Sequence, residues 1–282
     1  MSKPRVFAQV DVFTSVPMMG NPVAVVLDGE GLSDAQMQSF ANWTNLSETT
    51  FASPSPDDGA DYNIRIFTPS SELPFAGHPT LGTAHILQET GRMVPTNGTI
   101  RQRSAVGVVE IGVAGASLSF RLPEATISDA PDVPSLEDAL PGIAFASPPK
   151  VVNVGPHWVV GECTSSDALA ALSQDVVKLA LYDRTHGVTG QTLYAVNADG
   201  SIAVRSFAAG DGISEDPVCG SGNGAVAAYR LAQGQIERNQ SYRASQGKQV
   251  GRDGTVRISI DDAGDIHVGG SCVTLINGTV SI

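Results

Sequence analysis

Apolar and polar residues alternate along residues 6–12, where valine or alanine occupies every even position. An extended chain with this period of two has one apolar face, so the segment is expected to form a β-strand. A Gly-Asn-Pro turn at 20–22 leads into a second apolar run at 23–27, which predicts a hairpin. Ser33, with Gln36 three residues later, has the pattern of a capping box and predicts that a helix begins there.

Two glycine-containing loops lead into segments of small, apolar residues. The loop at 74–79 precedes residues 80–87, and the loop at 214–224 precedes residues 225–232. A helix that is apolar nearly all round must be buried, and small side chains let other elements approach it closely. Both segments are therefore expected to be buried helices.

The two loops belong to a longer internal repeat. Arg-Ile-Phe at 65–67 precedes the first loop and Arg-Ser-Phe at 205–207 precedes the second, at an offset of 205 minus 65, or 140. Within the loops, Ala76 and Cys219 correspond at 219 minus 76, or 143. We interpret the chain as a duplicated half, with a site between the two copies.

Each half is predicted to be an α+β unit. Short strands, one flanking helix and one small-residue helix follow one another, without the regular alternation of a βαβ series. We predict an N-terminal half at 1–125 and a C-terminal half at 126–272, with residues 273–282 packing back onto the first half. Residues 130–149 contain five prolines and are expected to be a linker.

Charge and composition exclude several classes of protein. The chain has 282 residues, with 17 basic and 29 acidic side chains and a formal net charge of −12, and it lacks the basic clusters that bind nucleic acid. It contains no run of 18 apolar residues and no signal peptide, so we expect a soluble, cytoplasmic protein that does not bind a membrane. Three widely spaced cysteines indicate neither a disulfide framework nor a metal site.

The loops before the two buried helices are candidate anion sites. Amides in the first turn of a helix have no partner within the helix, and the helix dipole favours negative charge there. We expect the amides of Gly77, Gly220, Ser221 and Gly222 to bind a carboxylate or an enolate. The ligand implied is a small carboxylate-bearing molecule.

Glu48, His78 and Asp216 are the candidate proton carriers. Moving a proton next to a carbonyl needs a base with a pKa near neutrality, which a carboxylate reaches when it is partly desolvated. Each residue also has a plain structural interpretation: Glu48 as an exposed loop acid or a capping side chain, His78 as a helix-capping or core histidine, and Asp216 as a turn cap. Cys219 is either a small buried hydrophobe or a thiolate stabilised by a helix N-terminus.

The glycines at 220–224 do not indicate a dinucleotide site. Position 225 is alanine, and the residues before the loop do not form the continuous strand of a βαβ unit. We therefore expect no nicotinamide cofactor.

Five motifs follow one another along nearly the whole chain. They are GNPVAVV at 20–26, NLSETTF at 45–51, FTP at 67–69, LPFAGHPTLGTA at 73–84 and EDPVCGSGNGA at 215–225. Together they resemble the phenazine biosynthesis PhzF-like isomerases, within the diaminopimelate epimerase-like superfamily. The resemblance implies two pseudo-symmetric domains, each a curled mixed sheet around a central helix, with the active site in the cleft between them and often a homodimer.

The resemblance also implies the chemistry, which is an isomerisation by proton transfer without a cofactor. Glu48 would be the acid/base that moves the proton. His78, Asp216 and Ser221 would orient the substrate and share in proton delivery.

Cysteine usage sets the alternatives. Related epimerases and racemases carry a cysteine on each loop, whereas this chain has Ala76 and Cys219 at those positions. Isomerisation through Glu48 is therefore the favoured function. The alternatives are an amino-acid or hydroxy-acid epimerase or racemase that uses Cys219, and a small-molecule binding protein without catalysis.

Overall fold

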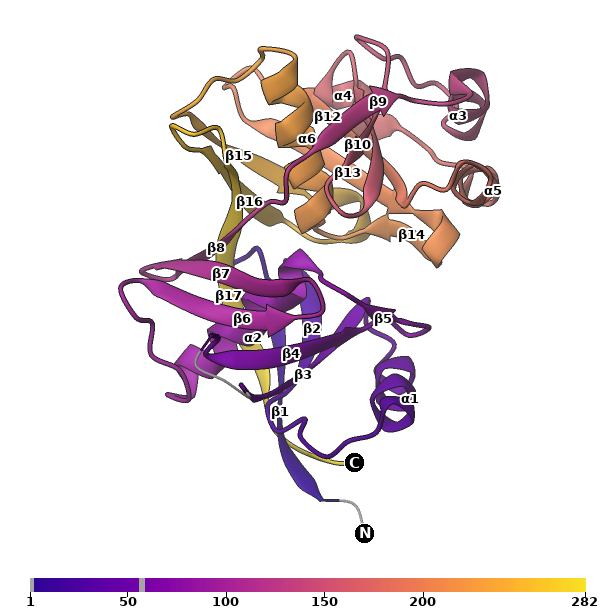
Figure 1. Ribbon diagram of the computed structural model, residues 1–282. Helices are drawn as coiled ribbons and strands as arrows, with labels where there is room; N and C mark the ends of the chain where they lie inside the picture. Colours follow the sequence, from indigo (N-terminus) through magenta and orange to yellow (C-terminus); the bar gives the residue numbers. More distant parts are fainter. Residues whose placement is uncertain (1–2, 56–58) are drawn as a thin grey trace. The chain divides into compact units, whose positions relative to one another are not determined.

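The described chain forms two compact units. The computed structural model describes residues 3–55 and 59–282 (Figure 1). The first unit runs to Arg121 and includes Gly269–Ile282, and the second unit is Leu122–Val268. Residues 1, 2 and 56–58, which belong to the predicted N-terminal half, lie outside the described residues. The units are defined by packing and the predicted halves by the repeat, so the boundaries at 125 and 272 stay a prediction.

The first unit is a mixed sheet with two helices. Its elements are β1 (Pro4–Val12), β2 (Asn21–Val26), α1 (Asp34–Thr44), β3 (Glu48–Pro54), β4 (Tyr62–Phe67), β5 (Glu72–Leu73), α2 (Gly77–Glu89), β6 (Thr99–Ser104), β7 (Gly107–Ala114), β8 (Ser117–Arg121) and most of β17 (Ile266–Ser281). β1 is antiparallel to both β2 and β17. β2 is parallel to β3, β3 is antiparallel to β4, and β4 is parallel to β6, from which β7 and β8 continue the sheet.

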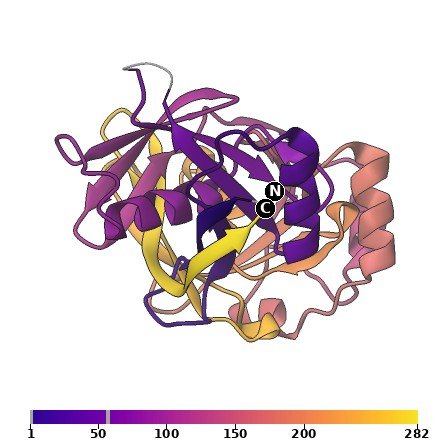
Figure 2. The same cartoon turned by 90° about the horizontal axis from the view of Figure 1, so that it is seen from below.

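The predicted strand, the antiparallel pairing of β1 with β2 and the capped helix of the first unit are confirmed. The predicted turn at 20–22 is wrong in position, because Asn21 and Pro22 already pair with β1 as part of β2. Ala8, Val10 and Val12 of β1 are fully buried, and Val12 pairs with the first residue of β2. Ser33 and Gln36 form both hydrogen bonds of a capping box at the start of α1. The end of β17 lies beside β1, as Figure 2 shows, and the Lys3 amide donates to the Ile282 carbonyl at 3.1 Å.

Helix α2 is buried, as its small apolar residues predict. It packs against β1, β2, β3 and β8. Gly82 allows this approach, because a Cβ there would lie 2.5 Å from Cγ1 of Val23. Its buried hydroxyls are paired: Thr83 with Thr50 at 2.8 Å, and Thr80 with the side-chain amide of Gln102 at 2.9 Å.

The second unit is also mixed. Its strands are β9 (Thr126–Asp129), β10 (Lys150–Asn153), β11 (His157–Glu162), β12 (Gly190–Val196), β13 (Ile202–Ala208), β14 (Ile213–Asp216), β15 (Ser241–Gln246) and β16 (Gly254–Ile260). Its helices are α3 (Val133–Ala139), α4 (Ser166–Ala171), α5 (Val176–His186) and α6 (Gly220–Ala232), with 3-10 turns η1 (Ala209–Asp211) and η2 (Lys248–Val250). β11 is parallel to β12, β12 is antiparallel to β13, and β13 is parallel to β15. Helix α6 is buried and packs against β10, β11, β12 and β16.

Two predictions for the second unit are wrong. The proline-rich stretch at 130–149 is not only a linker, because Asp132 caps α3 and both Leu136 and Leu140 are fully buried. The helical spacing of Leu169, Leu172 and Val176 predicts one capped helix from Ser166, but the structure has two helices, because α4 ends at Ala171 and α5 starts at Val176. None of the helices in the described residues is long and apolar enough to cross a membrane.

Candidate active site

The structure brings Glu48 and His78 together within the first unit. Glu48 is the first residue of β3 and pairs in parallel register with Val23 of β2. His78 is the second residue of α2. Oε2 of Glu48 lies 3.3 Å from Nε2 of His78, and the two side chains are 14% and 7% exposed. Glu48 is therefore not an exposed loop acid.

The environment of Glu48 tunes its acidity. Burial raises the pKa of Glu48 from its ordinary value of 4.5 to about 7, and a hydrogen bond from the Ser47 side chain opposes this only in part. At neutral pH, a carboxyl with a pKa near 7 is protonated in part of the molecules and ionised in the rest. It therefore meets the condition for general acid/base catalysis.

The first turn of α2 presents backbone donors beside this pair. Its N-cap residue, Ala76, supplies no side-chain hydrogen bond. In the described part of the chain, the Gly77 amide has no hydrogen-bond acceptor. A side chain at position 77 would require Phe120 to move, because a Cβ there would lie 2.6 Å from Cζ of Phe120. The close packing of the Phe120 ring against the first turn of α2 therefore depends on the missing side chain of Gly77.

In the second unit, the loop from Asp216 to Gly222 closes onto α6. Oδ1 of Asp216 accepts a hydrogen bond from the Val218 amide at 2.9 Å, which is a turn cap. Cys219 is the N-cap of α6, and its Sγ accepts from the Gly222 amide at 3.2 Å. The Gly222 amide is thus already engaged, which makes it a weaker candidate donor to a ligand than its neighbours.

Cys219 is a thiol, not a thiolate, in this environment. The residue is 5% exposed. Burial raises the pKa of Cys219 well above its ordinary value of 9.0, and the charge of Asp216 raises it further, while the Gly222 amide lowers it to a lesser extent. The stabilising effect of the helix N-terminus does not overcome the burial.

Ser221 and Gly220 keep groups available for a ligand. Oγ of Ser221 accepts a hydrogen bond from Nε1 of Trp158 at 3.0 Å and lies 3.6 Å from Sγ of Cys219. Among the residues that the structure describes, the backbone amides of Gly220 and Ser221 have no acceptor. Because its oxygen already accepts from Trp158, the Ser221 hydroxyl can donate its hydrogen either to Sγ of Cys219 or to a ligand that takes the place of the sulfur.

Three residues of this loop region are missing from the sequence prediction: Trp158, Asn223 and Gln246. Trp158 lies on β11 and Gln246 is the last residue of β15, so both reach the loop from strands far away in sequence. Asn223 Nδ2 donates to the Cys219 carbonyl at 2.8 Å and to Oε1 of Gln246 at 2.8 Å. No local sequence signal identifies these partners.

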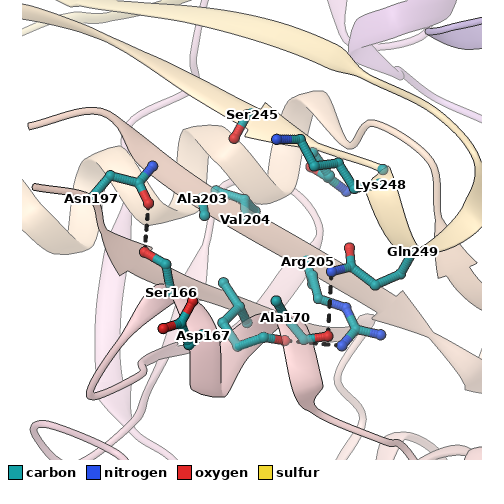
Figure 3. Close-up of a pocket in the computed structure, with 13 residues that line it drawn as sticks. Ser166, Asp167, Ala170, Asn197, Ala203, Val204, Arg205, Ser245, Lys248 and Gln249 are labelled. Carbon is teal, nitrogen blue, oxygen red and sulfur yellow. Dashed lines mark hydrogen bonds between the residues drawn. The ribbon is translucent and has the colours of Figure 1, made fainter. Parts of the chain in front are cut away.

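The second unit also contains a pocket of about 200 Å³, shown in Figure 3. Ser245 and Lys248 lie on one side and Ser166, Asp167 and Ala170 on the other. None of the predicted site residues lines this pocket, and its described lining contains no histidine, cysteine or glutamate. The guanidinium of Arg205, which also lines it, is engaged by Glu215. The pocket is therefore not the candidate active site.

Comparison with known proteins gives the family. Residues 10–278 match the family described as "Phenazine biosynthesis-like protein". The chain is 36% identical over 288 residues to "Antisense-enhancing sequence 1" of Schizosaccharomyces pombe, covering 96% of this chain and 97% of the relative. It is 34% identical over 285 residues to the trans-2,3-dihydro-3-hydroxyanthranilate isomerase of Pseudomonas fluorescens, again covering 96% and 97% of the two chains.

Solved structures share the mixed α+β fold. A PhzF-family phenazine biosynthesis protein of Bacillus anthracis superposes with a TM-score of 0.87 at 24% identity, covering 99% of this chain and 100% of that one. A hydroxyproline epimerase from Agrobacterium vitis superposes with a TM-score of 0.71 at 12% identity, covering 100% and 94% of the chains, which is a likeness of fold alone. The fold is thus that of diaminopimelate epimerase-like enzymes. The chain belongs to the PhzF family and is an isomerase of that family, which confirms the resemblance drawn from the five motifs.

Proposed function

We propose that this isomerase shifts a proton within a small carboxylate-bearing substrate, without a cofactor, and that Glu48 is the acid/base. One observation carries the proposal: a buried carboxyl with a pKa of about 7 lies 3.3 Å from the buried His78 ring. A binding protein would need neither a proton carrier nor its desolvation. The non-catalytic alternative is therefore less well supported.

The proposed mechanism uses Glu48 twice. Its carboxylate removes a proton from a carbon next to a carbonyl or an enamine, and the resulting carboxylic acid returns the proton to a different carbon of the same substrate. His78 lies close enough to hold the carboxyl in place and to share the proton. Charge that develops on the substrate would be stabilised by the amide of Gly77 and those of Gly220 and Ser221, aided by the helix dipoles.

We propose that both loops act on one substrate molecule. Asp216 and Ser221 of the second unit would orient the substrate whose proton Glu48 and His78 move. This proposal is supported by the sequence motifs that contain all four residues, because these motifs lie within the part of the chain that matches the family. The substrate class rests on the Pseudomonas fluorescens relative, whose name describes an isomerase of a hydroxyanthranilate, a cyclic amino carboxylate. A homodimer is part of the proposal through the family resemblance, and light scattering on the purified protein would test it.

The proposal includes two duplicated, pseudo-symmetric halves. In the first unit, β2 is parallel to β3, β3 antiparallel to β4, β4 parallel to β6 and β6 antiparallel to β7. The second unit has the same order of pairings along β11, β12, β13, β15 and β16. Arg65 stacks on Phe67 at 5.1 Å, and Arg205 stacks on Phe207 at 5.1 Å. These equivalences at repeat-related positions support a shared origin.

An epimerase that uses Cys219 is the weaker alternative. The raised pKa of Cys219 keeps the thiol protonated, so it is a poor base at neutral pH. The other loop has Ala76 where a second thiol would be needed. A mechanism in which one thiolate removes a proton and a second thiol returns one on the other face therefore lacks its thiolate base.

Proton exchange in heavy water tests the proposal. The protein is incubated with cyclic and amino carboxylates, including trans-2,3-dihydro-3-hydroxyanthranilate, and C–H signals are followed by NMR. Glu48→Gln should abolish exchange, while Glu110→Gln, which changes an exposed acid of the same unit, should not. Exchange that survives Glu48→Gln would refute the role of Glu48. If that exchange is then lost in Cys219→Ala, the epimerase alternative is the correct one.

A further inference from the structure

Gln246 makes all of its side-chain hydrogen bonds to the loop that carries Asp216 and Ser221. Its side chain is at the end of β15 and is 2% exposed. Oε1 accepts from the Cys219 amide at 3.1 Å and from Nδ2 of Asn223 at 2.8 Å. Nε2 donates to the Asp216 carbonyl at 2.9 Å. One side-chain amide therefore joins the end of β14, the N-cap of α6 and the first turn of that helix.

These partners fix the orientation of the amide. Two donors converge on its oxygen and one carbonyl faces its nitrogen, so a flipped amide would place NH₂ against two N–H groups and oxygen against oxygen. The Cys219 amide and the Asp216 carbonyl are backbone groups that need a partner when buried. Gln246 supplies both partners at once, and hydrophobic residues of the same size cannot.

The same contacts determine which backbone amides of the loop have an acceptor within the protein and which do not. Gln246 takes up the Cys219 amide, and Cys219 takes up the Gly222 amide. The amides of Gly220 and Ser221 are left between them, without an acceptor among the described residues. Gln246 thus holds the helix turn whose unpartnered amides are the candidate donors to a ligand.

The first unit has a glutamine at the corresponding place, with a different task. Gln102 of β6 lies 246 minus 102, or 144, residues earlier, close to the offset of the repeat. Its amide accepts from the Tyr62 hydroxyl at 2.8 Å and donates to the Thr80 hydroxyl at 2.9 Å. Those partners are side chains, whereas Gln246 holds loop backbone. Only the glutamine of the second unit therefore controls the path of a loop.

We propose that Gln246 is a positioning residue of the isomerase, which holds the Asp216–Ser221 loop in the geometry that receives the substrate. This proposal rests on the proposed function of that loop. Gln246 touches no reacting atom; it acts through the backbone of Asp216 and Cys219.

Two variants and a matched control test the proposal. Gln246→Leu removes all three hydrogen bonds. Gln246→Glu keeps the oxygen that accepts two donors, but it can donate to the Asp216 carbonyl only when its carboxyl is protonated. The control is Gln191→Leu, because Gln191 is a fully buried glutamine of the same unit that donates to Asp183 at 2.5 Å and, among the described residues, has no side-chain hydrogen bond to the loop.

Amide hydrogen exchange measures the protection of the loop backbone and needs no substrate. Gln246→Leu should speed exchange of the Cys219 amide at least about fivefold, the effect of losing one ordinary hydrogen bond. Gln191→Leu should speed exchange of that amide no more than it speeds exchange of other buried amides of the second unit. Equal protection of Cys219 in wild type and Gln246→Leu would overturn the proposal.

Catalysis provides the second measurement, with trans-2,3-dihydro-3-hydroxyanthranilate in heavy water as the probe and circular dichroism to establish that each variant is folded. Gln246→Leu should lower kcat/KM by about tenfold or more. Gln246→Glu should approach wild type as the pH falls, a pH profile that lost stability alone would not produce. Wild-type kcat/KM and pH profile in both variants would overturn the proposal. Activity that persists in Glu48→Gln would instead refute the proposed base, and the Cys219 exchange result would still decide the role of Gln246.

Discussion

Glu48→Gln should change how the stability of the protein depends on pH. The folded state holds the Glu48 proton more tightly than the unfolded state, because burial raises the pKa of the carboxyl from 4.5 to about 7. A group with a raised pKa contributes stability that is fully present below the unfolded pKa and is lost as the pH rises through the folded pKa. Wild type should therefore lose stability between about pH 4.5 and pH 7, and a glutamine, which does not ionise, should not show this loss.

The magnitude follows from the two pKa values. They differ by 7 minus 4.5, or about 2.5, and each pKa unit corresponds to about 1.4 kcal/mol. The free energy of unfolding of Glu48→Gln, relative to wild type, should therefore rise by about 3 kcal/mol between pH 4 and pH 8. Because the side chain is only 14% exposed, solvent screening reduces this value little.

Urea denaturation at a series of pH values measures the effect. Subtracting wild type from variant at each pH removes the contribution of titrating groups that do not interact with Glu48, Asp183 with its raised pKa of about 6 among them. Glu110→Gln, at an exposed position, is the control and should give a flat difference. A flat or falling difference for Glu48→Gln would refute the reasoning. It would mean that a protonated His78, 3.3 Å away, keeps the Glu48 carboxylate charged.

Further predictions concern packing and thiol chemistry. Arg205→Met should lower the free energy of unfolding by about 3–5 kcal/mol in a urea titration, because it leaves the buried Glu215 carboxylate without its partner. Arg65→Met, at the more exposed counterpart, should lower it by less than about 1 kcal/mol. Equal losses in the two variants would contradict this prediction. Gly77→Ala should cost about 1–3 kcal/mol and lower proton exchange, and adding Phe120→Leu should restore part of both. Cys219 should resist a thiol reagent at pH 8 in the folded protein and react once urea unfolds it; rapid labelling of the folded protein would contradict its raised pKa.

Elements with a strong local pattern could be predicted from the sequence. Strand β1 depends on alternation within residues 6–12, and α1 depends on a capping box between residues three apart. The small residues of α2 and α6 predicted their burial for the same local reason. In each case the chain segment itself contains the physical cause.

The geometry of the site depends on contacts that no local pattern contains. Glu48 and His78 are 30 residues apart, and their approach depends on the pairing of β3 with β2 and on the packing of α2 against both strands. The burial that tunes the pKa of Glu48 follows from this packing. Gln246 and Trp158 reach the second loop in the same way, from distant strands. The prolines at 130–149 are a local signal and indicated a linker. The burial of Leu136 in α3 is a tertiary contact, which the local sequence does not contain.

The path of β17 has a consequence for synthesis of the protein. This strand pairs with β1 and β8, so the sheet of the first unit requires residues 269–281, whereas the second unit is one continuous segment, Leu122–Val268. On the ribosome, the unit that emerges first is therefore completed last. Until the final strand leaves the exit tunnel, β1 and β8 each expose an unpaired edge of backbone donors and acceptors, which other chains can pair with. The nascent first unit is thus the stage at which strand edges of this protein are most open to pairing with other chains.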